Sequence, residues 1–263
     1  MKLFTATIAL SGIAVLCPAQ QLDFEYMAWP EVHRAIHQEG KTTVLIFSGG
    51  IEQRGPANIN GAHNVIAKAL SREIAQKLGN AIAGPVIPFS LNNANPDLPG
   101  TIGISSATFS ALNAEVAEQL IVNGFRNVVF LGDHGGGQKE LADLATKLQA
   151  KHRDKGIRVV YCPDVYEKAG AEVNKWLEAH GYPVGSHASI KDTSEMLYLG
   201  GSQGLVRKEL LPQAVGDKDS KNGIRGDARR STAEIGKVVS EIKVDLAVKQ
   251  IRALLGDAKP VAQ

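Results

Sequence analysis

The chain has 263 residues, of which 44% are hydrophobic and 21% are charged, and its formal net charge is +2. This length and composition suit one compact globular domain and argue against disordered and fibrous proteins. Because no block of Lys and Arg with interleaved aromatic residues occurs in the sequence, nucleic acid is not expected as a partner.

The first residues have the pattern of a secretory signal. Lys2 precedes an apolar run that ends at Cys17, and small residues, including Ala19, fit a cleavage site. We therefore predict that residues 1–19 are a signal peptide cleaved near Ala19 and that residues 20–263 form a single domain. The mature protein is then secreted or periplasmic, without membrane attachment after cleavage. A buried N-terminal helix is the alternative interpretation of this run.

Short apolar runs alternate with segments of helical periodicity after this region. The first apolar run covers residues 42–48, and residues 64–78 follow it with an apolar residue at every fourth position. The later elements are a strand at 81–89, a helix at about 106–123, a strand at 127–131, a helix at about 139–153 and a strand at 157–162. This alternation predicts a largely parallel sheet with helices on both faces.

The last predicted helix begins at Ser231, where Glu234 three residues later completes a capping-box pattern. Residues 211–230 before it are polar and rich in glycine. We expect a long surface loop here, of the kind that often borders an active site.

Polar residues follow the predicted strands at 50–56 and 132–138, and a third polar segment covers 185–194. Ligands of doubly wound proteins collect at the carboxyl ends of the strands, so these segments are candidates for a site. Their carboxylate and imidazole residues are Glu52, His63, Asp133, His134, His187 and Asp192. Such a mixture suits Zn²⁺ or Mn²⁺. Taken singly, each residue also has a structural explanation, such as an ion pair of Glu52 with Arg54 or helix capping by Asp192.

At these segments the chain resembles the creatininase (creatinine amidohydrolase) family. The family patterns E-Q-H-G-P-H, F-P-G-T, G-H-G-G-N and H-A-G-x-x-E-T-S have counterparts at 52–57, 98–101, 133–137 and 187–194. Their order and spacing agree. The resemblance implies a three-layer α/β/α fold with a mainly parallel central sheet, often hexameric, in which two divalent metals hold a water that attacks an amide carbonyl. By position it implies that Glu52, His134 and Asp192 are metal ligands.

The same resemblance implies that His187 transfers a proton or orients the substrate. Asp133 is expected either to orient the imidazole of His134 or to face the substrate. Asn64, beside His63 in the sequence, is a further candidate for contact with the ligands or the substrate.

Three departures from the family pattern change the expected metal content. Arg54 replaces the second ligand His, His63 stands where the bridging Asp is expected, and Asp192 is shorter than the family's Glu. Because a guanidinium is a permanent cation, we predict one Zn or Mn ion per subunit, held by Glu52, His63 and His134. Asp192 either completes the metal's coordination or acts as a base.

Arg54 then neutralises nearby carboxylates, or it binds a substrate carboxylate or a developing oxyanion. The alternative is that Arg54 merely fills a lost metal site.

Together these observations predict a metal-dependent hydrolase of a carbon–nitrogen bond in a small amide or cyclic amide, acting as a homo-oligomer, with the hexamer as the family's form. The sequence contains no G-x-S-x-G elbow, and no dinucleotide fingerprint follows the first strand. Two alternatives stay open: a catalytically inactive protein that binds a small ligand, and a structural subunit that supports an active partner.

Overall fold

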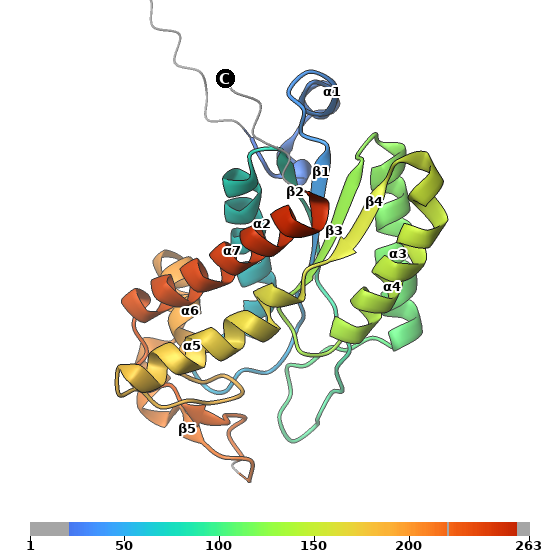
Figure 1. The fold of residues 1–263 in the computed structure, drawn as a ribbon. Helices are drawn as coiled ribbons and strands as arrows, with labels where there is room; N and C mark the ends of the chain where they lie inside the picture. Colours follow the sequence, from blue (N-terminus) through green and yellow to red (C-terminus); the bar gives the residue numbers. More distant parts are fainter. Residues whose placement is uncertain (1–20, 220, 257–263) are drawn as a thin grey trace, which may run out of the picture.

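The computed structural model describes residues 21–219 and 221–256, so the predicted signal peptide lies outside the described residues. A four-stranded sheet lies at the centre (Figure 1). Its strands are β1 (Thr43–Ser48), β2 (Ala81–Ile87), β3 (Asn127–Gly132) and β4 (Arg158–Tyr161), in the order β2-β1-β3-β4. All three pairings in this sheet are parallel, as predicted.

Helices cover both faces of the sheet. Successive side chains of a strand point to opposite faces, so each strand contributes apolar side chains to both helical layers. Leu45 and Phe47 of β1 pack with α2 (Ala62–Leu78) and α7 (Ala233–Leu255). Val44 and Ile46 pack on the other face, with α3 (Ser106–Val122) and α4 (Gln138–His152). The predicted three-layer α/β/α fold is therefore confirmed.

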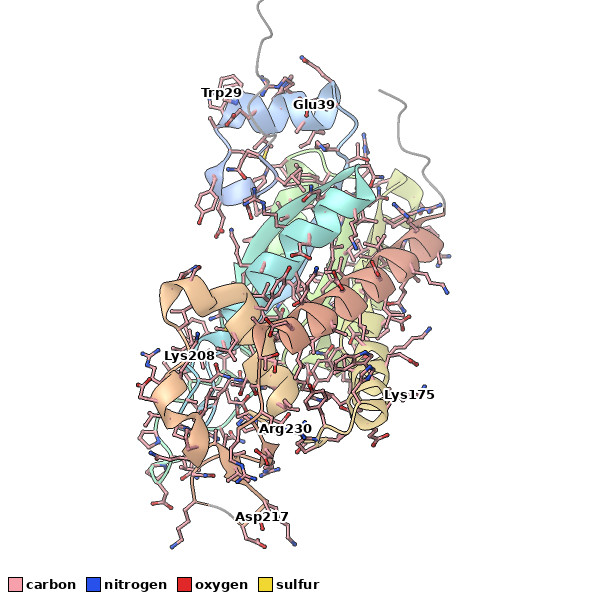
Figure 2. The ribbon with its side chains drawn as sticks, turned by 90° about the vertical axis from the view of Figure 1, so that its left-hand side faces the viewer. Trp29, Glu39, Lys175, Lys208, Asp217 and Arg230 are labelled. Atoms are coloured by element: carbon pink, nitrogen blue, oxygen red, sulfur yellow. The ribbon has the colours of Figure 1, made fainter. Side chains whose placement is uncertain are left out.

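The remaining elements lie mainly at the two ends of the sheet (Figures 1 and 2). Helix α1 (Trp29–His37) lies at one end, whereas α5 (Glu167–Ala179), α6 (Ile190–Gly200) and a hairpin of β5 (Val215–Gly216) and β6 (Gly226–Asp227) lie beyond the carboxyl ends of the strands. Short 3-10 helices cover Phe24–Tyr26, Arg153–Lys155, Pro163–Val165, Gly201–Gln203 and Lys208–Gln213. Within the described ranges, no helix combines the length and apolarity needed to cross a membrane.

The predicted start of the last helix was wrong. Helix α7 begins at Ala233, and Thr232 rather than Ser231 is its N-cap, with its side chain accepting from the Ile235 N–H. Ser231 is held elsewhere, because its hydroxyl donates to the carbonyl of Ile190. The segment 211–230, expected to be a long surface loop, also contains the short antiparallel pairing of β5 with β6.

Candidate active site

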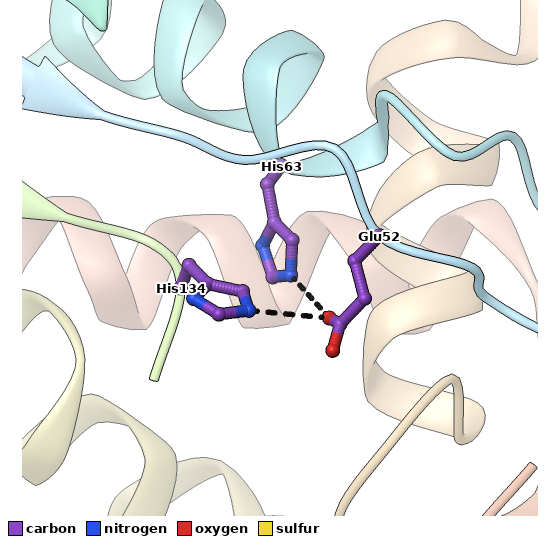
Figure 3. A group of neighbouring side chains, drawn as sticks. All are labelled: Glu52, His63 and His134. Atoms are coloured by element: carbon purple, nitrogen blue, oxygen red, sulfur yellow. Dashed lines mark hydrogen bonds and ion pairs between the residues drawn. The ribbon is translucent and has the colours of Figure 1, made fainter. Parts of the chain in front are cut away.

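Three predicted ligand residues meet at the carboxyl end of the sheet (Figure 3). Ser48 of β1 pairs with Gly132 of β3, so the segments that follow these strands leave the sheet side by side. Glu52 and His134 lie on these two segments, and His63 is the second residue of α2. Their ligand atoms all lie within 4.8 Å of one another. Glu52 Oε2 is 3.3 Å from Nε2 of His63 and 3.5 Å from Nε2 of His134.

The pKa of Glu52 keeps this carboxyl ionised. Burial alone would raise its pKa, but the adjacent imidazoles of His134, His63 and His187 hold it well below the usual range. A carboxylate beside two imidazoles is a donor set that Zn²⁺ and Mn²⁺ accept.

Asp133 fixes the orientation of His63. Its Oδ2 is 2.7 Å from His63 Nδ1, and its Oδ1 accepts from Lys243 Nζ at 2.8 Å. Burial opposes ionisation of Asp133, but Lys243 and His63 lower its pKa overall. An ionised Asp133 assigns the proton of His63 to Nδ1, so the lone pair of Nε2 faces Glu52. The expectation that Asp133 orients His134 was wrong, because the carboxylate turns toward α2 and α7.

His134 is oriented by the glycine-rich turn that contains it. Its Nε2 lies 3.1 Å from the Asn92 amide nitrogen, and its Nδ1 accepts from the backbone N–H of Gly136 at 2.9 Å. These contacts fix the orientation of the ring, with Nε2 toward Glu52. Gly136 allows this turn, since a Cβ there would lie 2.1 Å from the carbonyl oxygen of Leu91.

Arg54 occupies the space between the remaining polar groups. Its side chain is only 2% exposed, and Nη2 is 2.9 Å from Asp192 Oδ1. Nη1 donates to His63 Nε2 at 2.5 Å and lies 3.7 Å from Glu52 Oε2. The guanidinium therefore bridges the side chains that a second metal ion would need.

Asp192 is the third residue of α6, and its Oδ2 accepts from the backbone N–H of Ser189 at 2.9 Å. Ser189 is the N-cap, so Asp192 completes a capping box rather than capping the helix itself. Burial opposes its ionisation, but Arg54 and then Lys191 lower the pKa of Asp192. Its two oxygens thus serve α6 and Arg54.

His187 also approaches Glu52 Oε2. Its Nε2 is 2.9 Å from the carbonyl of Gln53, which assigns the proton to Nε2, and its Nδ1 is 3.7 Å from Glu52 Oε2. Burial lowers the pKa of His187, and although Glu52 opposes this, the pKa stays below its usual value. His187 is therefore a neutral imidazole whose free lone pair faces the site.

Asn64 does not face the site, contrary to expectation. Its Oδ1 accepts from the Gly50 N–H at 2.8 Å and its amide donates to the carbonyl of Pro88. Successive residues of a helix point about 100° apart, so Asn64 turns away from the direction of His63. It holds the backbone after β1 in place.

A buried charge network behind the site was not predicted from the sequence. Lys243 of α7 donates to Asp133 and also to Glu195 Oε2 at 2.6 Å. The sequence did contain a signal, because Lys243 falls on the apolar stripe of α7, four residues from both Val239 and Ala247. The network connects α7 and α6 to His63 through Asp133.

Glu195 makes stability depend on pH. Burial raises the pKa of Glu195. Lys243 lowers it and Asp133 raises it, and the result is a pKa of about 7 instead of 4.5. Between these values the folded state binds a proton that the unfolded state has lost, so the unfolding free energy falls as pH rises, and this loss is complete above about pH 7.

We expect Glu195→Gln to remove about 1 to 3 kcal/mol of this dependence. Thermal unfolding from pH 5 to 8 checks it, with exposed Glu241→Gln as the control; equal slopes in wild type and Glu195→Gln would contradict it.

These side chains line a cavity of about 940 Å³ that opens beyond the carboxyl ends of the strands. Such a volume accommodates a small organic ligand. A parallel α/β/α fold with a cluster of carboxylate and imidazole groups at this end has the arrangement of a metal-dependent hydrolase.

The family model for creatininase, described as creatinine amidohydrolase, matches residues 25–251, and the chain belongs to this family. It is 27% identical over 203 residues to the mycofactocin precursor peptide peptidase of Mycolicibacterium smegmatis, covering 74% of this chain and 78% of that protein. A crystal structure of creatinine amidohydrolase superposes with a TM-score of 0.73 at 18% identity, covering 91% of this chain and 100% of that one. A manganese creatininase superposes with a TM-score of 0.71 at 19% identity, covering 90% and 100%.

The side chains present fit one metal ion and do not fit two. Glu52, His63 and His134 each offer a ligand atom, these atoms lie within 4.8 Å of one another, and Asp133 holds the proton of His63 at Nδ1. A second ion would need the space between His63, Glu52 and Asp192, and Arg54 contacts all three. A permanent cation in that space excludes the second ion.

Proposed function

We propose that the protein hydrolyses a carbon–nitrogen bond in a small amide or cyclic amide with one zinc or manganese ion per chain. The observation that carries the proposal is the convergence of Glu52, His63 and His134 on one point of an open cavity, beside the neutral imidazole of His187. Family membership supports amide hydrolysis, and the peptidase named among its relatives supports an amide bond as the target.

A bound divalent ion supplies Lewis acidity and makes water ionisable near neutral pH. The chain's own residues supply the rest. His187 has a free lone pair at Nδ1, 3.7 Å from Glu52 Oε2, where it can accept a proton from a reacting group. Asp133 holds His63 in one tautomer, and Asn92 and Gly136 fix the ring of His134, so neither imidazole must reorient.

Arg54 supplies the positive charge that a second ion would supply. It lies between Glu52 and Asp192, and its charge lowers the pKa of Asp192. Because its two terminal nitrogens already contact Asp192, His63 and Glu52, we assign it to charge neutralisation within the site rather than to capture of a substrate carboxylate.

The test uses protein expressed from Gln20 onward without a metal-binding tag. We expect elemental analysis to find about one zinc or manganese per chain. We also expect the loaded protein to hydrolyse at least one member of a panel of amides, lactams and formamides, and a chelator to abolish this turnover. Absence of turnover across the panel from protein shown to contain metal would overturn the proposal.

A second candidate is a binding protein that has lost catalysis. The contact of Arg54 Nη1 with His63 Nε2 at 2.5 Å favours it, since this hydrogen bond uses the lone pair that a metal would need. This candidate predicts that a ligand raises the melting temperature without being turned over.

We also propose that the protein is exported and assembles as a homo-oligomer. Cell fractionation tests the export, and light scattering tests the assembly.

A further inference from the structure

The cavity is lined by cationic side chains that the chemistry above does not use, among them Arg225 and Lys191. Arg225 is exposed. Within residues 21–219 and 221–256, neither side chain forms an ion pair, whereas Arg54 and Lys243 are each held by two carboxylates or more. These two cations are therefore available to a ligand.

The backbone places Arg225 directly beside His187. The two residues form an antiparallel bridge, in which Arg225 N–H donates to the His187 carbonyl at 3.0 Å and His187 N–H donates to the Arg225 carbonyl at 3.3 Å. Directly opposite residues of an antiparallel pair carry their side chains on the same face, with Cβ atoms about 5 Å apart. Since His187 faces Glu52, Arg225 faces the same cavity one side chain further out.

Two glycines make this pairing possible. A Cβ on Gly185 would lie 2.7 Å from the Arg225 carbonyl oxygen, and a Cβ on Gly226 would lie 2.9 Å from the Cα of Gly185. Gly226 also has a φ of +141°, a conformation that other residues rarely adopt. The close approach fixes the strand that carries Arg225 against the segment that carries His187.

Lys191 lines the cavity from a different element, helix α6. It is the second residue of α6 and precedes Asp192, so its position is tied to the helix that also holds Arg54. Arg225 and Lys191 thus reach the same cavity from two different elements.

We propose that Arg225 and Lys191 form a subsite for a carboxylate, so that the substrate is an amide carrying a free carboxylate a few atoms from the bond that is cleaved. An N-acyl amino acid or the C-terminal end of a peptide has this chemistry. A guanidinium binds a carboxylate through two parallel hydrogen bonds, and the Lys191 ammonium adds a second charge. This inference rests on the proposed hydrolase function for the identity of the cleaved bond, but the subsite itself can be measured by binding.

The test compares N-benzoylglycine with its neutral counterpart N-benzoylglycinamide, by calorimetric or NMR titration of the metal-loaded protein. We expect the carboxylate to bind about tenfold more tightly or better. Arg225→Gln and Lys191→Gln should each remove most of this preference and leave the affinity for the neutral amide unchanged. Lys208→Gln, which removes a surface charge outside the cavity (Figure 2), is the matched control and should keep the preference.

Repeating the titration after chelation separates the subsite from direct binding of the carboxylate to a metal, because the preference should persist in metal-free protein. Equal affinities for the two probes, no binding of either probe, or a preference that survives Arg225→Gln combined with Lys191→Gln would each overturn the subsite. Hydrolysis is followed in parallel. A preference without turnover supports the subsite and counts against the hydrolase, whereas turnover without a preference does the reverse.

Discussion

His134→Ala is expected to abolish metal binding and to lower kcat/KM by about a thousandfold or more, since the contribution of a bound metal to amide hydrolysis is worth several kcal/mol. The variant removes one of the three groups that converge at Glu52, and Asn92 is then left facing an empty space. Metal content by elemental analysis and kcat/KM on the best amide of the panel are the two measurements.

The control for this variant is His33→Ala. His33 is exposed on α1, at the end of the molecule opposite the site, so the same substitution there should leave metal content and kcat/KM unchanged. A folded His134→Ala protein that keeps about one ion per chain would show that Glu52, His63 and His134 are not the ligands. The metal-dependent mechanism would then have to be abandoned at this position.

The fold was predictable because its strands are apolar throughout and its helices follow at regular spacing. Residues 127–131 are nearly all apolar, as expected of a strand buried on both faces, and β3 does pack between two helical layers. Helix α5 was missed, because its apolar face is made by few residues, among them Val173 and Leu177. Its position depends on packing against the 3-10 helix before it and against α7, which no local pattern reveals.

The identity of the site residues was predictable, but their partners were not. Polar residues at the ends of β1 and β3 meet because parallel strands end at the same edge of a sheet. Asp133 was expected either to orient His134, its neighbour in the sequence, or to face the substrate, yet it contacts His63, 70 positions away. The direction in which the Asp133 side chain leaves its turn decides which histidine it contacts. This direction depends on Lys243, which approaches Asp133 from α7. Sequence spacing carries no information about that approach.

Arg54→Ala is expected to raise the metal content from about one ion per chain to about two when zinc or manganese is in excess. Removing the guanidinium frees the lone pair of His63 Nε2 and leaves Glu52 and Asp192 without their cation. The oxygens of these two carboxylates are then available to a second divalent ion, while His63 stays a ligand of the first. Elemental analysis after gel filtration measures the stoichiometry.

The metal-free form of Arg54→Ala should also be less stable than wild type, by about 3 kcal/mol, because removing one partner of a buried ion pair leaves the other charge uncompensated. Added metal should restore this loss in the variant and have a smaller effect on wild type, since a ligand stabilises only the state that binds it. Denaturant unfolding with and without metal measures both quantities.

Arg54→Lys is the matched variant, because it keeps the positive charge but cannot contact His63 and Asp192 with the two arms of a planar group. We expect it to bind one ion, as wild type does. If charge is what excludes the second ion, Arg54→Lys and Arg54→Ala differ in metal content. One ion in both variants would contradict this explanation. It would mean that the site cannot hold a second ion even when the space is free, because Asp192 is already bound to the backbone in the α6 capping box.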